Sequence, residues 1–234
     1  MHKTHADITE IFSSIQGEGI FVGAKQVFVR FKNCNISCNF CDESRDAAGK
    51  VYTPEALMDE VELLNEKNGL HHSVSLTGGE PLCYTDFLTA LLPLFGRIGR
   101  KAYLETNGTL PDELARVIDH VNIVAMDFKL PSSTGGRAFW DEHLEFLTIA
   151  SKKIVFVKAV VTPETTSVDI RKAVSLIASL GKHIPFILQP VTPVKSSDRE
   201  IDKNRLLEFM EIGINHSLEC IRVIPQVHKM MGIK

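Results

Sequence analysis

Apolar runs alternate with amphipathic stretches along the chain from about residue 26 to its end. Short runs rich in β-branched and aromatic residues are typical of strands that are buried on both faces. Strands are therefore predicted at residues 26–31, 73–77, 101–105, 121–126, 153–161, 185–189 and 220–224. The amphipathic stretches predict helices at residues 54–68, 84–96, 111–119, 137–151, 167–181 and 199–214.

Local capping signals support two of these helix starts. Thr53 precedes Pro54, a threonine cap followed by the proline that is common at the first helical position. The stretch SVDIRK, which begins at Ser167, carries a similar signal. Both helices therefore have defined amino-terminal ends.

Strands that alternate with helices predict an α/β fold with a parallel sheet covered on its outside. Seven strands and six helices approach a (β/α) barrel but stop short of its eight units. We expect a partial (β/α) barrel of about six to seven parallel strands, and a doubly wound open sheet is the second choice. At 234 residues the chain suits a single domain over 1–234, with its last strand and tail at about 219–234.

Polar residues and glycines follow nearly every predicted strand. In parallel barrels the chemistry gathers at the carboxyl ends of the strands. Those ends read TGGEP, ETNG, MDFKLPSS, TPETT, QPVTP and PQVHK. Their convergence predicts one shared site at the mouth of the partial barrel.

Composition narrows the class of partner. The net charge is −3, and no basic run is longer than Lys152-Lys153, so neither nucleic acid nor a membrane surface is expected as a partner. The first ten residues, MHKTHADITE, are polar and contain no signal core. We expect a cytoplasmic protein.

The stretch CNISCNFC places three of the five cysteines within eight positions, directly after the first predicted strand. In a reducing compartment such a group more often ligates metal than forms disulfides. Three thiolates on a four-iron cluster leave one iron free to bind a small molecule, whereas a catalytic zinc with three ligands is the rival interpretation. Cys83 and Cys220 stand alone in apolar contexts, which predicts buried packing for both.

The spacing CxxxCxxC with an aromatic residue before its last cysteine resembles the signature of radical S-adenosylmethionine (SAM) enzymes. The segment TGGEP, Thr77 to Pro81, resembles the loop with which that superfamily holds the methionine amine. The resemblance implies a 4Fe–4S cluster on Cys34, Cys38 and Cys41, with SAM chelating the open iron. One electron then cleaves the sulfonium and releases a 5′-deoxyadenosyl radical.

The glycine segment also has a physical rationale of its own. Gly78 and Gly79 can adopt backbone angles closed to other residues and allow a ligand to approach closely. Glu80 then stands available to a cationic amine. A strand-end turn with a solvated glutamate is the alternative.

The segment before the first predicted strand carries a second candidate group. Gln16 and Glu18 lie among glycines in QGEG and offer donors and acceptors able to read the amide-like edge of a heterocycle. Arg30 lies inside the strand, where a buried guanidinium needs an anionic partner and its planar fork suits a carboxylate. A nearby structural glutamate is the alternative partner.

From EIFSSIQGEG through the cysteines, TGGEP, ETNG and QP to the terminal HK, the chain resembles the 7-carboxy-7-deazaguanine synthase family. The resemblance implies ring contraction of 6-carboxy-5,6,7,8-tetrahydropterin with loss of ammonia, begun by hydrogen abstraction at C6 of the pterin. It also implies Mg²⁺, an electron donor such as flavodoxin or ferredoxin, a homodimer, and a place in 7-deazapurine (queuosine) biosynthesis.

Residue roles follow from the same resemblance, and none is that of a general acid or base. The residues expected to bind SAM are Phe40, Asp42, Gly78, Gly79, Glu80, Asp127, Phe128, Lys129, Gln189, Pro190, Val191 and Thr192. Those expected to bind the pterin are Ile15, Gln16, Gly17, Arg30, Thr77 and His228. Glu43 takes the magnesium position, where many members carry threonine, and Asp127-Phe128 replaces a common Ser-Pro.

Two other functions share part of this pattern. A glycyl-radical-enzyme activase has the same cysteine spacing but acts on a protein partner, and QGEG with Arg30 argues against it. A non-catalytic iron–sulfur or zinc module has no need of polar groups at so many strand ends.

Overall fold

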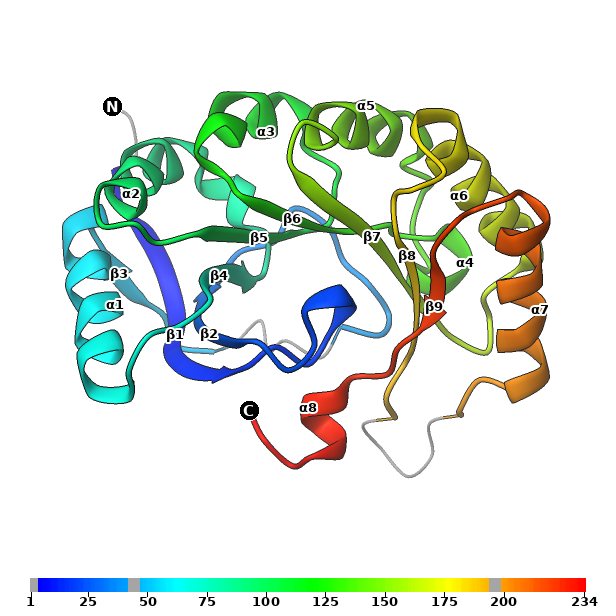
Figure 1. The fold of residues 1–234 in the computed structure, drawn as a ribbon, viewed down its shortest axis with the longest axis horizontal. Coiled ribbons are helices and arrows are strands. Elements are labelled where there is room, and N and C mark those ends of the chain that lie inside the picture. Colours follow the sequence, from blue (N-terminus) through cyan, green and yellow to red (C-terminus); the bar gives the residue numbers. More distant parts are fainter. Residues whose placement is uncertain (1–3, 42–46, 194–198) are drawn as a thin grey trace.

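The computed structural model describes residues 4–41, 47–193 and 199–234. Within them one curved sheet of nine strands runs through the molecule in the order β3-β1-β2-β4-β5-β6-β7-β8-β9. β3 and β9 lie at its two edges and do not pair with each other, so the sheet stays open (Figure 1).

The parallel part of the sheet matches the predicted strands closely. Each strand from β5 to β9 pairs in parallel with the one before it, and β4 pairs in the same way with β2. The prediction of a partial barrel of six to seven parallel strands is confirmed. The strands are β2 (Lys25–Phe31), β4 (Ser73–Gly78), β5 (Ala102–Thr106), β6 (Ile123–Asp127), β7 (Ile154–Val161), β8 (Phe186–Pro190) and β9 (Ile221–Val223).

Two further strands were not predicted. β1 (Ala6–Ile15) pairs antiparallel with both β2 and β3 (Lys50–Tyr52). β1 reads ADITEIFSSI, a mixture of polar and apolar residues instead of an apolar run, because most of its residues are only partly buried. The antiparallel pair extends the parallel sheet and carries the QGEG segment to its concave side.

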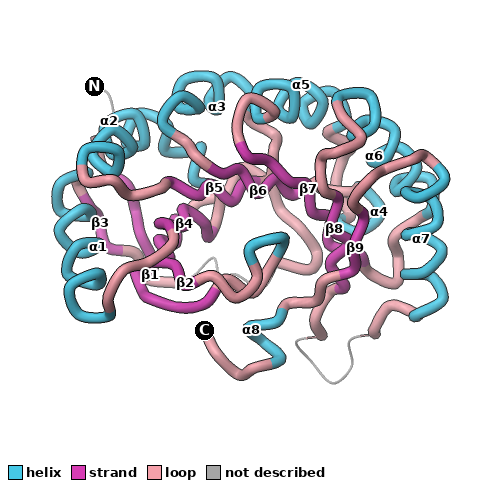
Figure 2. The backbone as a smooth tube through the Cα atoms, in the orientation of Figure 1, coloured by secondary structure: helices cyan, strands magenta, loops and turns pink. Residues whose placement is uncertain are grey.

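Helices cover the convex side of the sheet, as Figure 2 shows most clearly. The Thr53 hydroxyl accepts a hydrogen bond from the Ala56 N–H, which confirms the first capping prediction. The second helix begins at Ser167 as expected, but its capping residue is Thr166, just before SVDIRK, whose hydroxyl accepts from the Asp169 N–H. The longer helices are α1 (Pro54–Asn68), α2 (Thr85–Arg97), α3 (Pro111–Val117), α5 (Trp140–Ala150), α6 (Ser167–Leu180) and α7 (Lys203–Asn215). Short elements that were not predicted are α4 (Pro131–Thr134), α8 (Val227–Met230) and the 3₁₀ turns η1 (Gly19–Phe21), η2 (Pro81–Tyr84) and η3 (Ile118–His120).

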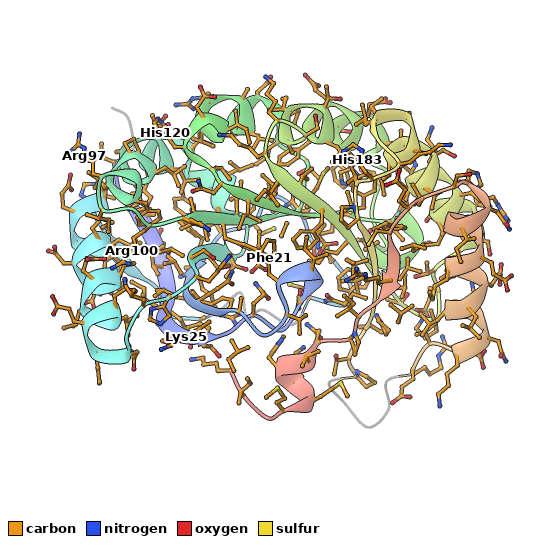
Figure 3. All side chains as sticks on the ribbon, in the orientation of Figure 1. Phe21, Lys25, Arg97, Arg100, His120 and His183 are labelled. Atoms are coloured by element: carbon orange, nitrogen blue, oxygen red, sulfur yellow. The ribbon has the colours of Figure 1, made fainter. Side chains whose placement is uncertain are left out.

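A large apolar core lies between the sheet and these helices, and a small second cluster lies on the concave face. The second cluster contains Tyr103 and Phe156, against which η1 packs Phe21. Figure 3 shows Phe21 inside the curve of the sheet. η1 therefore fills the amino-terminal half of the partial barrel and leaves its carboxyl-terminal mouth open.

The two isolated cysteines differ from their prediction of buried packing. Cys83 is exposed on η2, and Cys220 is only partly buried just before β9. Their apolar neighbours in the sequence point into the core, whereas the cysteines themselves occupy positions that face outward.

Candidate functional site

A cavity of about 750 Å³ opens at the carboxyl ends of the parallel strands. Residues of the loop after β1, of the cysteine segment, of the strand ends and of the carboxyl-terminal segment line it. Figure 1 shows α8 and the chain end lying across the open side of the partial barrel. The volume lies in the usual range for small-molecule sites, and the location is the one predicted from the strand-end residues.

The concave face changes from apolar to polar along each strand. Side chains two positions apart point to the same face of a strand. Tyr103, Ala125, Phe156 and Ile187 belong to the apolar cluster on the concave face. The residues two positions later line the cavity: Glu105, Asp127, Lys158 and Gln189. The alternation of each strand thus sets a ring of polar side chains above an apolar floor.

A network of buried charges connects this ring. The Lys158 ammonium lies 2.5 Å from Glu18 and 3.4 Å from Asp127, and Lys129 lies 2.9 Å from the same Asp127 oxygen. Gln226 donates a hydrogen bond of 2.8 Å to the other oxygen of Glu18. Burial alone would raise the pKa of Glu18, but the charge of Lys158 and these hydrogen bonds lower it to about 2. The pKa of Lys158 rises correspondingly, so both groups stay charged.

Two acceptor atoms of the ring have no hydrogen-bond partner among the described residues. They are Oδ1 of Asp127 and Oε1 of Gln189, both buried in residues that line the cavity. A buried acceptor without a donor is costly, so such atoms point to a ligand that supplies the donor. The hydroxyl and ammonium groups of a nucleoside-type cofactor are donors of this kind.

The cysteine segment forms another wall of the cavity. Cys34, Cys38 and Cys41 all line it, and the Cys41 N–H donates to the Cys38 carbonyl at 3.2 Å. Burial raises the pKa of the Cys34 and Cys38 thiols, while the charge of Lys129 acts in the opposite direction. Lys129 also lies over the ring of Phe40, 5.5 Å from its centroid. Three thiols beside a cationic side chain are a suitable donor set for an iron–sulfur cluster.

The two glycines of TGGEP are explained by backbone packing. Gly78 has a positive φ of 99°, and a Cβ there would lie 2.6 Å from the Phe31 carbonyl oxygen. A Cβ at Gly79 would lie 2.1 Å from the Asn33 carbonyl oxygen. The predicted close approach to these glycines is therefore made by the backbone that leads into the cysteine segment.

Glu80 lies away from the cavity. Its carboxylate is fully buried and accepts hydrogen bonds from the Leu82 N–H, the Thr106 hydroxyl and the Asn107 N–H, at 2.7 to 3.1 Å. Burial raises its pKa to about 7, against the effect of these bonds. The Glu80 carboxylate thus links η2 to the end of β5. It does not face the cavity, where contact with the amine of SAM was expected.

A second polar group surrounds Glu105 at the end of β5. Its carboxylate accepts hydrogen bonds from Gln16 (2.9 Å), Ser75 (2.7 Å) and Thr77 (3.2 Å). Next to it, Gly17 packs so closely on His228 that a Cβ would lie 2.0 Å from the ring Nδ1. The residues expected to bind the pterin, from three separate segments, thus meet at one place.

Arg30 contacts a structural glutamate, the alternative partner, and also faces the cavity. Its Nε lies 3.3 Å from Glu10, a structural glutamate on the neighbouring strand, and its guanidinium lies over Phe12. The side chain also lines the cavity, as expected of a group that meets a substrate carboxylate.

Most predicted site residues converge on this cavity, and three do not. Glu80, Phe128 and Pro190 are not among its lining residues. Phe128 instead stacks on His143 at 4.6 Å. Phe128 and Pro190 each follow an inward-pointing residue, so strand alternation turns them away. Asp42 and Glu43 lie outside the described residues. Those that line the cavity are Ile15, Gln16, Gly17, Arg30, Cys34, Cys38, Phe40, Cys41, Thr77, Gly78, Gly79, Asp127, Lys129, Gln189, Val191, Thr192 and His228.

Sequence reasoning considered Glu18 only as part of QGEG, and it gave no role to several other polar residues that line the cavity, among them Glu105, Lys158 and Gln226. Glu18 and Glu105 stand in quoted motifs, and Gln226 in a quoted strand end. For Lys158 the signal was a single lysine inside the apolar run KIVFVKAVV, because a buried charge requires a partner.

Comparison with known proteins identifies the family. The model of the radical SAM superfamily matches residues 28–177. The chain is 39% identical to the 7-carboxy-7-deazaguanine synthase of Geobacter sulfurreducens, covering 99% of both chains. It is 33% identical to the enzyme of the same name from Methanothermobacter thermautotrophicus, covering 98% of both.

Solved structures agree on the fold. QueE from Escherichia coli superposes with a TM-score of 0.64 at 23% identity, over 97% of this chain and 96% of that one. A radical SAM methyltransferase from Sphaerobacter thermophilus gives a TM-score of 0.65 at 15% identity, over 86% and 66%. The cysteine segment, the strand-end cavity and the full-length relatives lead to one conclusion: the chain belongs to the 7-carboxy-7-deazaguanine synthase family of the radical SAM superfamily.

Proposed function

We propose that this enzyme converts 6-carboxy-5,6,7,8-tetrahydropterin to 7-carboxy-7-deazaguanine with ring contraction and loss of ammonia, as a radical SAM lyase of 7-deazapurine biosynthesis. The observation that carries the proposal is a single cavity lined both by three cysteines and by the Gln16–Glu105–Thr77 group. Its full-length relatives bear the name of this activity. None of the relatives described above is named as an activase or as a non-catalytic metal-binding module.

The cysteine wall would hold the 4Fe–4S cluster through Cys34, Cys38 and Cys41. The cluster and SAM together supply a 5′-deoxyadenosyl radical. The protein orients SAM and keeps water away from the reacting carbon. Asp127 Oδ1 and Gln189 Oε1, the buried acceptors without a partner among the described residues, would receive hydrogen bonds from the hydroxyl or ammonium groups of SAM.

Glu105, together with Gln16 and Thr77, which donate hydrogen bonds to it, would bind the ring edge of the pterin. A carboxylate accepts two parallel hydrogen bonds from the N–H groups of a guanidine-like ring edge, a pairing that is both strong and directional. Gln16 and Thr77 hold Glu105 in place for this contact. Arg30 would meet the substrate carboxylate from the neighbouring strand, and the His228 ring would close the opposite side against Gly17.

We also propose that Glu43 is the protein ligand of the magnesium ion. Carboxylate oxygens are the preferred protein ligands of Mg²⁺, so Glu43 would bind the ion directly in the position where many members use threonine. Replacing Glu43 with Thr tests this role. A changed magnesium concentration for half-maximal activity supports Glu43 as the ligand, and an unchanged one removes it from the metal site.

Further expectations concern partners and surroundings. We propose a low-potential electron donor such as flavodoxin or ferredoxin, a homodimer, a cytoplasmic location and one radical SAM domain over residues 1–234. The single sheet that runs from β1 to β9 supports the last of these. No helix among the described residues is long and apolar enough to cross a membrane.

The proposal is tested by anaerobic turnover with SAM, a reductant and the carboxylated tetrahydropterin. Formation of 7-carboxy-7-deazaguanine and ammonia, absent in a Cys38→Ala control, supports it. Uncoupled cleavage of SAM without the deazaguanine would indicate a different substrate, and purified protein containing zinc but no iron would rule out the radical reaction.

A further inference from the structure

Asn107 lies between the end of β5 and the cysteine segment. It is buried, with 6% of its surface exposed, and it lines the cavity. Its side chain lies within hydrogen-bonding distance of Cys34, the first of the three cysteines.

The orientation of the Asn107 amide follows from its partners. Its Oδ1 accepts hydrogen bonds from the N–H (3.0 Å) and the hydroxyl (2.6 Å) of Thr109. The amide nitrogen must therefore face the other way, toward the cysteine segment. There it donates to Oδ1 of Asn35 at 2.8 Å and lies 3.8 Å from Sγ of Cys34.

The backbone of Asn107 is held as firmly as its side chain. The N–H donates to Glu80 at 2.7 Å, and the carbonyl oxygen accepts from Nε2 of the buried His143 at 3.2 Å. Two buried side chains from different parts of the chain thus fix the residue. A side chain held in this way keeps its N–H directed at the sulfur without further ordering.

We propose that Asn107 donates an N–H···S hydrogen bond to the Cys34 thiolate and thereby raises the reduction potential of the cluster. Adding an electron to a cluster increases the negative charge on its sulfur ligands. A donor aimed at one of them stabilises the reduced state more than the oxidised state. The bond therefore eases the one-electron reduction that starts each turnover.

If Asn107 only anchored the cysteine segment, replacing it would affect the reduction potential no more than replacing another anchoring residue. Asn35 also connects the cysteine segment to the end of β5, because its amide donates to the Thr109 hydroxyl at 2.8 Å and accepts from Asn107. Asn35→Ala removes this connection and leaves the N–H of Asn107 beside Cys34. Asn107→Leu preserves the approximate size of the side chain and removes the donor, so the two variants separate anchoring from hydrogen bonding.

The inference rests on the proposed function only in that Cys34 must ligate the cluster, and its test needs no substrate. The midpoint potential is measured by anaerobic redox titration, followed by electron paramagnetic resonance, in the cluster-containing protein. For Asn107→Leu we expect the ratio of reduced to oxidised cluster at a fixed potential to fall about tenfold, a shift of about 59 mV for one electron. Asn107→Asp, which replaces the donor by an acidic oxygen, should shift the potential in the same direction.

Asn35→Ala should change the ratio less than about threefold, because it removes hydrogen bonds to Thr109 and Asn107 but no donor to sulfur. Equal shifts in Asn35→Ala and Asn107→Leu, or no shift in Asn107→Leu, would overturn the inference. So would failure of both Asn107 variants to assemble a cluster that Asn35→Ala still assembles. A shifted potential in a protein that forms no deazaguanine would contradict the proposed function alone.

Discussion

The Lys158 ammonium lies 2.5 Å from the Glu18 carboxylate, and this ion pair joins β7 to the loop after β1. Both side chains are largely buried, with 11% and 15% of their surface exposed. Through Lys158, which also lies 3.4 Å from Asp127, the pair connects the loop after β1 to the end of β6. The pair is therefore central to the shape and the charge balance of the site.

Replacing Lys158 with Met should destabilise the protein. Loss of the ammonium leaves Glu18 and Asp127 buried without their shared cation, which typically costs about 3 kcal/mol or more of the free energy of unfolding. Urea denaturation of the anaerobic, cluster-containing protein measures this change. Lys172→Met, at an exposed position on α6, is the matched control and should stay within about 0.5 kcal/mol of the parent.

The double variant Glu18→Gln/Lys158→Met should regain most of the loss, because Glu18 is then neutral and Asp127 keeps Lys129 as its partner at 2.9 Å. Equal stabilities of Lys158→Met and Lys172→Met would show that the pair contributes nothing.

Gly17→Ala should disturb the packing of His228. The added Cβ would lie 2.0 Å from the ring Nδ1, so the ring or α8 has to move, at a cost of about 1–3 kcal/mol. We expect a lower free energy of unfolding and a raised KM for the pterin. Gly96→Ala in α2, where nothing lies within 4 Å of the added Cβ, is the control and should be neutral or stabilising.

Adding His228→Ala to Gly17→Ala should relieve the clash and restore stability toward that of His228→Ala alone. If Gly17→Ala behaves like Gly96→Ala in both measurements, the contact between the two segments is not as tight as described.

Glu80 should make stability depend on pH between about 4.5 and 7. Its pKa is raised in the folded state, from 4.5 to about 7, so folding favours its protonated form. The stability from this group is fully present below pH 4.5 and is lost as the pH rises through 7, by at most roughly 3 kcal/mol. Glu80→Gln stays neutral throughout this range.

The free energy of unfolding of the parent relative to Glu80→Gln should therefore fall as the pH rises from 4.5 to 7. Urea denaturation at several pH values measures the difference. A difference that does not vary with pH would mean that Glu80 ionises as an exposed carboxylate does.

The parallel strands and long helices were predictable because each carries its own periodic signal. β1 was missed because a strand that is only partly buried lacks the continuous apolar run by which the others were recognised. Phe128 and Pro190 were assigned to the site from a motif, whereas strand alternation turns both away from it. The same alternation, counted two positions on from Phe156, finds Lys158.

Glu80 illustrates what local sequence cannot supply. The pattern GGE at a strand end indicates an available carboxylate, but its hydrogen-bond partners Thr106 and Asn107 lie at the end of the next strand and just beyond it. Their approach depends on the pairing of β4 with β5. Burial that arises from such distant contacts changes the role of a residue without leaving a local signal.

The most direct measurement of the proposed reaction uses the tetrahydropterin labelled with deuterium at C6, incubated anaerobically with the enzyme, SAM and a reductant. We expect 7-carboxy-7-deazaguanine and ammonia in equal amounts, with deuterium appearing at the 5′ carbon of SAM and no net consumption of SAM. Accumulation of unlabelled 5′-deoxyadenosine without deazaguanine would contradict the account.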